Sequence, residues 1–353
     1  MKARPRSDLL LNFPICYHLH MKKEERLFKK LVERATNILI LTHRGPDIDA
    51  FSSALLLKIS LEEIYPKKKF ALQAKQGPTI KLPRMKDVEI VDRLDSTGFN
   101  LIIVTDAGDM SLCASDADNI SNDIQKIYID HHDTFFNYVQ GEVLINNNMS
   151  SAAEQVHELL RNVYGKRFKL DEDKAELVQY GIVSDTGRFL YDITTPNTHR
   201  VFADAKEITA IDLEDFAYRN SKFPREATTA VIKYLESLTI EKDMAYMYIS
   251  REDLENNEEL NKGASMARIF LKDKYLRFIQ GVHWGFIIKP DMNTDNIWTA
   301  SFRSTKGYQD VKLITEELGG GGHIYAAGVR IEANSLDEML EKILKVCREH
   351  LEK

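Results

Sequence analysis

The stretch Ile38-Leu39-Ile40-Leu41-Thr42-His43-Arg44-Gly45-Pro46-Asp47-Ile48-Asp49 decides which fold class the sequence predicts. Its first four residues form a short apolar run rich in β-branched side chains, which is typical of a strand buried in a parallel sheet. Its second half is polar and contains one histidine and two aspartates. The apolar residues 54–57 then predict a helix that starts at Ser52, with Ser52 as its cap, and runs to about Tyr65.

The same order of strand, polar turn and helix repeats along the first 220 residues. Residues 101–104 predict a strand that ends at Asp106, and residues 126–129 predict another that ends at Asp130-His131-His132. Helical patterns occupy residues 21–36, residues 151–165 and the stretch from Asp171 toward Asp185. Strands that alternate with helices indicate an α/β domain with a mainly parallel sheet.

The pattern changes after about residue 220. Residues 226–238 predict a bridging helix, and strand-like runs follow at 243–250, 277–288 and 297–303. A glycine run at 319–322 and a closing helix from Ser335 complete a smaller α/β domain with a mixed sheet. The predicted parts are a flexible extension at 1–20, a catalytic domain at 21–222, a helical linker at 223–240 and a substrate-binding domain at 241–353.

Composition and charge restrict the classes of function. The chain has 353 residues and a net charge of −6, and its longest basic run is Lys67-Lys68-Lys69. Binding of long duplex nucleic acid would require a basic excess, so we expect a small anionic substrate instead. Cys16, Cys113 and Cys347 lie too far apart to form a disulfide framework or a zinc finger, and we expect buried reduced thiols.

We expect a cytoplasmic protein without membrane contact. No apolar stretch approaches the roughly 18 residues of a membrane span. The basic residues before Leu9 mimic the start of a signal peptide, but Asn12 and Pro14 interrupt the apolar run and no small-residue cleavage site follows.

Acidic residues and histidines gather at or near the predicted carboxyl ends of strands and at one helix end. They are His43, Asp47, Asp49, Asp106, Asp130, His131, His132 and Asp185. Ligand sites of open α/β sheets lie outside the carboxyl ends of strands, so these segments can converge. Packing so many carboxylates and imidazoles together is costly unless cations neutralise them. The mixture suits Mn²⁺, Fe²⁺, Co²⁺ or Zn²⁺, with Mg²⁺ as a further candidate.

Five ordered motifs resemble those of the DHH phosphoesterase superfamily. Residues 43–50 resemble its first motif, Asp106 its second, Asp130-His131-His132 the signature that names it, and residues 181–189 its fourth. Residues 319–328 (GGGGHIYAAG) resemble the DHH-associated domain, and Arg303-Ser304 upstream fits the substrate-binding arginine of that domain. The domain order and residues 149–154 further resemble the nano-RNase type, the bifunctional oligoribonuclease and pAp phosphatase.

The resemblance implies a role for each motif residue. His43 and Asp47 would hold one divalent metal, Asp49, His131 and Asp185 a second, and Asp106 would bridge the two, with Mn²⁺ as the expected ion. Asp130 would orient a metal-bound imidazole, and His132 would face the substrate phosphate while the two metals activate water. Substrate binding would fall to Arg303, Ser304, Gly320, Gly321, Gly322 and His323, although four glycines can also form a tight turn.

The resemblance therefore implies an enzyme that hydrolyses short 5′-phosphorylated RNA to mononucleotides and pAp to AMP. Two alternatives stay open: a cyclic-dinucleotide phosphodiesterase and a non-catalytic nucleotide-binding module. Dimerisation also stays open. Gly45 replaces the usual asparagine of the first motif and removes one hydrogen bond to a ligand, which leaves the fine specificity undecided.

Overall fold

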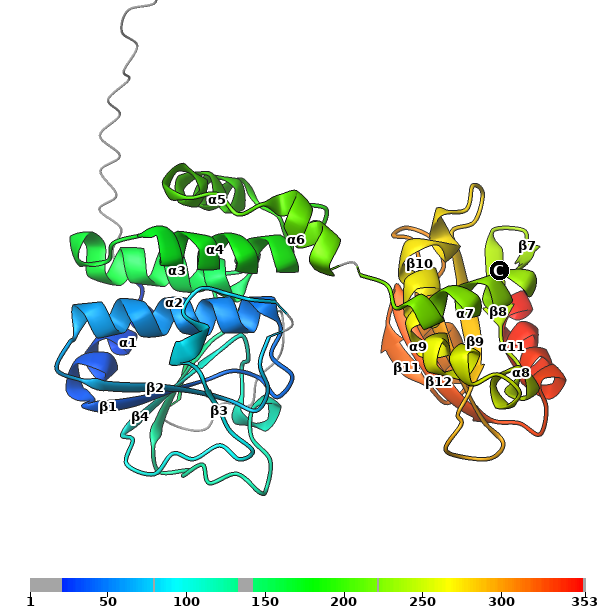
Figure 1. Ribbon diagram of the computed structural model, residues 1–353, viewed down its shortest axis with the longest axis horizontal. Helices are drawn as coiled ribbons and strands as arrows, with labels where there is room; N and C mark the ends of the chain where they lie inside the picture. The colour runs from blue at the N-terminus through cyan, green and yellow to red at the C-terminus, as the bar shows by residue number, and fades with distance from the viewer. Residues whose placement is uncertain (1–20, 79, 133–141, 221, 352–353) are drawn as a thin grey trace, which may run out of the picture. The chain divides into compact units, whose positions relative to one another are not determined.

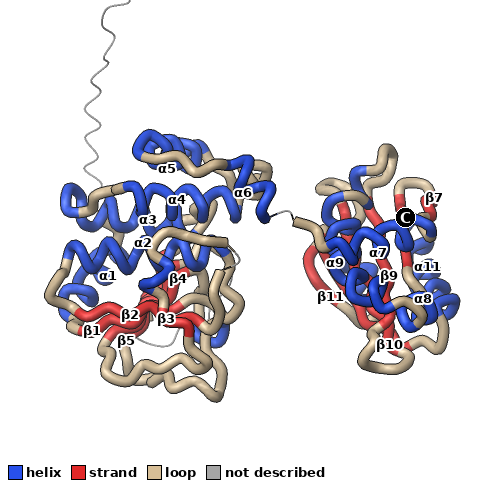
Figure 2. Tube along the Cα trace, in the orientation of Figure 1, coloured by secondary structure: helices blue, strands red, loops and turns tan. Residues whose placement is uncertain are grey.

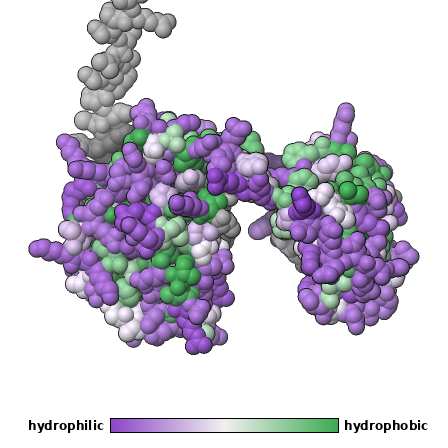
Figure 3. All heavy atoms as spheres, viewed as in Figure 1, coloured by the Kyte–Doolittle hydropathy of each residue, from purple (hydrophilic) through white to green (hydrophobic). Residues whose placement is uncertain are grey.

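The computed structural model describes residues 21–78, 80–132, 142–220 and 222–351 (Figure 1). The chain forms two compact units, Met1–Asn220 and Ser221–Lys353. The extension expected at residues 1–20 lies outside the described residues. Hydrophilic side chains cover most of the visible surface, with hydrophobic side chains in smaller patches between them (Figure 3).

The first unit is built on a six-stranded sheet whose strands are all parallel. The strand order is β3-β2-β1-β4-β5-β6. The strands are β1 (Asn37–Leu41), β2 (Lys69–Ala74), β3 (Glu89–Ile90), β4 (Leu101–Thr105), β5 (Gln125–Ile129) and β6 (Val143–Ile145). The chain proceeds from β1 outward to β2 and β3 and then returns to β4 on the other side of β1. This reversal opens a crevice at the carboxyl ends of β1 and β4, where ligands of such sheets bind.

Helices cover one face of this sheet. They are α1 (Lys23–Arg34), α2 (Ile48–Ile64), α3 (Ala152–Tyr164), α4 (Glu172–Asp185), α5 (Pro196–Ile208) and α6 (Leu213–Asn220). Helix α2 lies between the sheet and α3 and α4 (Figure 1), and this position explains why nearly all its residues are buried. Short 3₁₀ turns, η1 (Met85–Asp87), η2 (Met110–Leu112) and η3 (Gly165–Arg167), interrupt the connections. Loop residues, Cys113 among them, pack on the opposite face of the sheet.

The start of α2 corrects one expectation from the sequence. The helix begins at Ile48, and the side chain of Asp47 caps it by accepting the amide of Ala50 at 3.0 Å. Ser52 lies inside the helix, fully buried, and its hydroxyl has no hydrogen-bond partner among the described residues. Ser52 therefore does not cap the helix, because Asp47, five positions earlier, fills the cap position and places Ser52 in the helix interior.

The second unit contains a mixed sheet in the order β11-β12-β10-β9-β8-β7. Its strands are drawn in red in Figure 2. The strands are β7 (Thr239–Glu241), β8 (Met244–Tyr248), β9 (Trp284–Pro290), β10 (Ile297–Ser304), β11 (Gly321–His323) and β12 (Ala326–Glu332). The pair β8 and β9 is parallel and the other pairs are antiparallel. The mainly parallel first sheet and the mixed second sheet confirm the predicted fold class.

Both faces of the second sheet carry helices. They are α7 (Arg225–Glu236), α8 (Arg251–Glu255), α9 (Glu258–Lys274), α10 (Val311–Glu317) and α11 (Leu336–Leu351), with a 3₁₀ turn, η4, at Leu276–Phe278. One core joins α7 and α9 to Met247 and Ile287, and another joins α10 and α11 to Phe286 and Phe302. Helix α7, inside the expected linker range 223–240, thus packs in the core of the second unit.

Two further expectations concern the cysteines and the membrane spans. Cys113 and Cys347 are free and buried, as expected, and Cys16 lies outside the described residues. Across the described part of the chain, no helix combines the length and the apolar character that crossing a bilayer would require.

Candidate metal centre

The first sheet brings the sequence-predicted acidic residues and histidines of four segments to one place. His43, Asp47 and Asp106 form one group of potential ligands, and Asp49, His131 and Asp185 form another. Within each group the ligand atoms lie within 4.8 Å of one another. All six expected metal ligands therefore converge, and His132 joins them through a third group with Asp106 and His131.

Asp106 lies between the two groups. Its Oδ2 is 3.5 Å from Nε2 of His43, and its Oδ1 is 3.4 Å from Nε2 of His131. The residue directly follows β4 and has a left-handed backbone with φ of 59°, which is uncommon for a residue with a side chain. Its amide donates to the carbonyl of Ile129 at 2.8 Å and so fixes the turn. Each carboxylate oxygen thus faces a different group, which is the arrangement that a bridging ligand requires.

Asp49 is held by the first turn of α3. Its carboxylate is fully buried, and its two oxygens accept the amides of Ala152 at 2.6 Å and Ala153 at 3.0 Å. These amides belong to the first turn of α3, where unpaired N–H groups and the helix dipole favour a negative charge. Gly181 of α4 packs so closely here that a β-carbon on it would lie 2.4 Å from Oδ1 of Asp49.

Glu154 fixes the start of α3 and was not identified as a site residue from the sequence. Its buried carboxylate accepts the hydroxyl of Ser150 at 2.6 Å, the hydroxyl of Thr198 at 2.9 Å and the side-chain amide of Asn197 at 2.8 Å. The glutamate therefore ties α3 to the start of α5. The sequence signal was the Ser151…Glu154 capping pattern, but Glu154 bonds Ser150 and α5 instead of closing the box on Ser151.

Asp130 orients His132. Its Oδ1 accepts the backbone amides of His131 at 2.8 Å and His132 at 3.3 Å, and it lies 2.8 Å from Nδ1 of the His132 ring. Asp130 is buried, whereas 54% of the His132 side chain is exposed. The imidazole that Asp130 contacts is therefore the exposed one, which leaves the Nε2 side of His132 for a substrate.

The charged side chains of the cluster shift one another's pKa values. Burial, followed by the charges of Asp185 and Asp106, raises the pKa of Asp49. Burial alone would lower the pKa of His131, but the carboxylates of Asp106 and Asp185, 3.4 and 3.1 Å from its Nε2, outweigh it and raise this pKa to about 11. The hydrogen bond to Asp130 likewise raises the pKa of His132. The carboxylates thus retain positive charge on the histidines when no other cation is present.

The residues fit divalent cations. Asp106 Oδ1 and His131 Nε2 are buried, and neither has a hydrogen-bond partner of acceptable geometry among the described residues. Unpaired buried polar atoms are costly, so two of them pointing into one cluster of carboxylates indicate a missing partner. Carboxylate oxygens and imidazole nitrogens without thiolates match the preferences of Mn²⁺ and similar ions.

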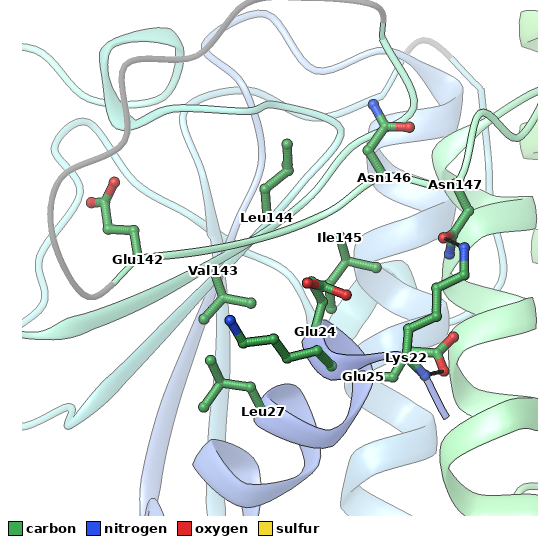
Figure 4. Close-up of a pocket in the computed structure, with 11 residues that line it drawn as sticks. Lys22, Glu24, Glu25, Leu27, Glu142, Val143, Leu144, Ile145, Asn146 and Asn147 are labelled. Carbon is green, nitrogen blue, oxygen red and sulfur yellow. Dashed lines mark hydrogen bonds between the residues drawn. The ribbon is translucent and has the colours of Figure 1, made fainter. Parts of the chain in front are cut away.

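A cavity of about 450 Å³ opens beside the cluster. Its lining includes His43, Asp47, Asp106, Asp130 and His132. Another pocket, of about 550 Å³, lies between α1 and β6, where Lys22 reaches Asn147 and the side chains of Glu24 and Glu25 lie nearby (Figure 4). None of the metal-binding groups found among the described residues lines this second pocket.

The substrate-binding residues expected in the second unit lie on or next to β10, β11 and β12. Arg303 pairs with Ala326, which pairs with His323, so the arginine and the histidine share one face of the sheet. The guanidinium of Arg303 donates from Nε to Asp273 at 2.8 Å. Ser304 points to the opposite face and is fully buried, so its hydroxyl is not available to a substrate in this conformation.

The glycine run ends α10 and forms an edge strand. Gly319 has φ of +82° directly after the helix, and Gly321 and Gly322 belong to β11. A β-carbon on Gly320 would lie 2.4 Å from the carbonyl oxygen of Gly328, so close packing on β12 explains this glycine. Space around Gly321 is open, with nothing within 4 Å of its missing β-carbon. The tight turn that the sequence left open is therefore present, but it ends α10 and leads into β11.

Comparisons with known proteins agree with this geometry. Residues 37–182 match the DHH family, N-terminal domain, and residues 243–349 match the DHHA1 domain. The bifunctional oligoribonuclease and PAP phosphatase NrnA of Bacillus subtilis is 28% identical over 324 residues, covering 89% of this chain and 95% of the relative.

Two further similarities extend the comparison. The cyclic-di-AMP phosphodiesterase GdpP of B. subtilis is 25% identical over 92% of this chain and 49% of its own length. A solved structure of an exopolyphosphatase-related protein from Bacteroides fragilis, 21% identical, covers 94% of this chain and 98% of that chain with a TM-score of 0.71, which shows a shared fold. With both domain matches in place, the chain belongs to the DHH family of phosphoesterases.

Proposed function

We propose that this phosphoesterase hydrolyses short 5′-phosphorylated oligoribonucleotides to mononucleotides and pAp to AMP. The observation that carries the proposal is the convergence of two ligand groups on Asp106. Two cations held by one bridging carboxylate are a common arrangement for displacement at phosphorus. The NrnA relatives, which match over nearly their whole length, support the substrate class.

Two divalent ions, most suitably Mn²⁺, belong to the proposal. His43 and Asp47 would hold one, Asp49, His131 and Asp185 the other, and Asp106 both. When bound, such ions lower the pKa of water and neutralise the charge of a phosphate. Asp49 is positioned for this role by the two α3 amides, which fix its carboxylate before any ion arrives.

His132 would act on the substrate directly. Because Nδ1 contacts Asp130, the Nε2 side of the exposed ring is the one that a phosphate can approach. The raised pKa of His132, caused first by the hydrogen bond to Asp130, favours the protonated imidazole. The protonated ring donates a hydrogen bond to the phosphate and can give its proton to the leaving oxygen as the P–O bond breaks.

The second unit would select the substrate. Arg303 is suited to a terminal phosphate, since a guanidinium binds phosphate through two parallel hydrogen bonds. His323 is exposed in the same row of the sheet. A cyclic-dinucleotide phosphodiesterase is the second candidate, because GdpP and a Listeria monocytogenes relative named PdeA also match, although the chain spans only about half their length.

Product chromatography with purified protein and Mn²⁺ tests the proposal. We expect chelator-sensitive release of AMP from pApA and from pAp. Turnover of cyclic di-AMP alone would favour the second candidate, and no turnover of any of the three would overturn both. Asp106→Asn is the matched inactive control, because it removes the bridging charge and keeps the size of the side chain.

A further inference from the structure

Tyr308 is one of several exposed aromatic residues of the second unit. Trp284 and Trp298, also candidates for base stacking by residue type, are almost completely buried in the core of the second unit. Half of the Tyr308 side chain is exposed. Its ring lies on the ring of His283, with centroids 3.6 Å apart and planes inclined by 15°. The two rings form a stack that carries Tyr308 at the surface.

The loop holds this stack in place before any ligand binds. The amide of Tyr308 donates to the carbonyl of Thr305 at 3.1 Å and closes a turn. Gly307, inside that turn, has φ of +86°, a conformation that favours glycine. The amide of Thr305 donates to the carbonyl of His283 at 2.8 Å, so the loop is joined to the strand segment that carries the histidine. A platform fixed in this way loses little conformational entropy when a flat ligand binds.

The stack lies on the same face of the sheet as Arg303. Arg303 is directly opposite Gly285, and His283 precedes Gly285 by two residues, so His283 and Arg303 are diagonal neighbours. Such neighbours have α-carbons about 7–8 Å apart. On the other side of Arg303 stand Ala326 and then His323. The aromatic stack, the arginine and the histidine therefore lie along one face of the sheet, with the small side chain of Ala326 between Arg303 and His323.

Charge near the stack favours an anion beside it. Arg303 and Lys272 share one carboxylate, Asp273, with distances of 2.8 and 2.6 Å. The guanidinium of Arg277 donates to the carbonyl of Ser304 at 3.2 Å, next to the turn that carries Tyr308. Arg303 and Lys272 thus share the charge of one carboxylate. A bound phosphate would supply further negative charge to these cations.

We propose that Tyr308, backed by His283, is a stacking platform for one nucleobase of the substrate, while Arg303 and His323 take an adjacent phosphate. The proposal rests on the function proposed above and names the part of the nucleotide that the second unit recognises. Stacking is tolerant of base identity because every base has a π-face. The platform therefore selects nucleotides over phosphate compounds without a base, and does so without strong preference for one base.

Steady-state kinetics with Mn²⁺ tests the platform. The substrates are pApA and two analogues in which an abasic spacer replaces one base or the other. We expect Tyr308→Ala to raise KM for pApA about 5- to 150-fold, the range of base–aromatic stacking, with kcat changed less than about threefold. With the analogue that lacks the stacked base, the same substitution should change nothing. Tyr308→Phe and Tyr308→Trp should keep the KM of the unaltered enzyme, since stacking requires the ring and not the hydroxyl.

The control variant is Tyr218→Ala, which removes an exposed tyrosine from α6 of the first unit. We expect its KM for all three substrates to equal that of the unaltered enzyme. An equal KM increase in Tyr308→Ala for pApA and for both abasic analogues would overturn the platform, as would an unchanged KM for pApA.

A binding measurement separates this proposal from the proposed function. Stacking on an aromatic ring quenches the fluorescence of 2-aminopurine, so a 2-aminopurine analogue of pAp can be titrated into full-length Asp106→Asn without turnover. We expect quenching, and its loss in Asp106→Asn combined with Tyr308→Ala. Failure of all hydrolysis with quenching retained would overturn the proposed function alone, and quenching that does not depend on Tyr308 would overturn the platform alone.

Discussion

The candidate metal centre of the first unit and the Arg303 face of the second unit use charge in opposite ways. The carboxylate of Asp49 is buried and receives two fixed backbone amides, and Asp106 is buried with one oxygen toward each histidine group. Arg303 and His323, by contrast, lie on β10 and β11, the strands on either side of β12, where His323 is exposed and Arg303 partly buried. A site for cations requires ligand side chains that are held in position before the ion binds. A surface proposed to hold a nucleotide tolerates adjustment of its side chains.

The largest effect should come from Asp106, the proposed bridging carboxylate. Asp106→Asn keeps the size of the side chain but removes its charge, so we expect kcat/KM for pApA to fall by about 10³ or more, since bound metals contribute several kcal/mol to such reactions. Metal content of the purified protein should fall as well. Asp109→Asn, a nearby carboxylate that caps η2, is the control. If Asp106→Asn kept a tenth of the activity or more, this result would contradict the bridging role of Asp106.

A substitution at Gly181, which packs against Asp49, tests whether the candidate metal centre is rigid. A β-carbon on Gly181 would lie 2.3 Å from the β-carbon of Ala153 and 2.4 Å from Oδ1 of Asp49, so Gly181→Ala must displace one of them. We expect Mn²⁺ affinity to fall about 10- to 100-fold, as when partners of metal ligands are disturbed. Gly77→Ala is the control, because nothing lies within 4 Å of its missing β-carbon. Equal Mn²⁺ affinity of the two variants in a calorimetric titration would contradict the rigid centre.

A substitution of Arg303 in the second unit should change KM and leave the metal content of the protein unchanged. Arg303→Gln removes a cation that pairs with Asp273, and we expect KM for pApA to rise about tenfold, consistent with a charged hydrogen bond of about 1.5–3 kcal/mol. Metal content should equal that of the unaltered protein. A loss of bound Mn²⁺ in Arg303→Gln would break the separation of roles between the two regions.

The smallest effect should come from Ser52. Its buried hydroxyl lacks a partner among the described residues, so Ser52→Ala removes an unsatisfied group and should change the free energy of unfolding by less than about 1 kcal/mol, toward greater stability. Ser53→Ala is the comparison, because the hydroxyl of Ser53 donates to the carbonyl of Ala50 at 3.0 Å. Urea denaturation measures both, and a clear destabilisation by Ser52→Ala would show that this hydroxyl has a partner.

The sequence predicted the elements that carry periodic or continuous apolar patterns. β1, β4 and β5 lie where the apolar runs at 38–41, 101–104 and 126–129 indicated, and each is followed by candidate ligands. The run at 277–288 was only partly a strand, since β9 begins at Trp284 after the turn η4. Short or edge strands such as β3 and β6 gave no comparable signal, because two or three residues show no period.

Contacts between distant segments explain what the sequence did not predict. The amides that hold Asp49 come from α3, more than 100 positions away, and their role depends on close packing at Gly181. The pairing of Arg303 with Asp273 likewise joins β10 to α9. Neither relation follows from local spacing, whereas the convergence of the candidate ligands followed from the general geometry of parallel sheets.

The spread of the candidate ligands from His43 to Asp185 links metal binding to unfolding. A cation held by segments so far apart binds the folded first unit and not its unfolded chain, so it stabilises that unit by about 2.7 kcal/mol at a concentration 100 times its Kd. No comparable group was found among the described residues of the second unit. In scanning calorimetry, Mn²⁺ should therefore raise the unfolding temperature of the first unit while that of the second stays constant.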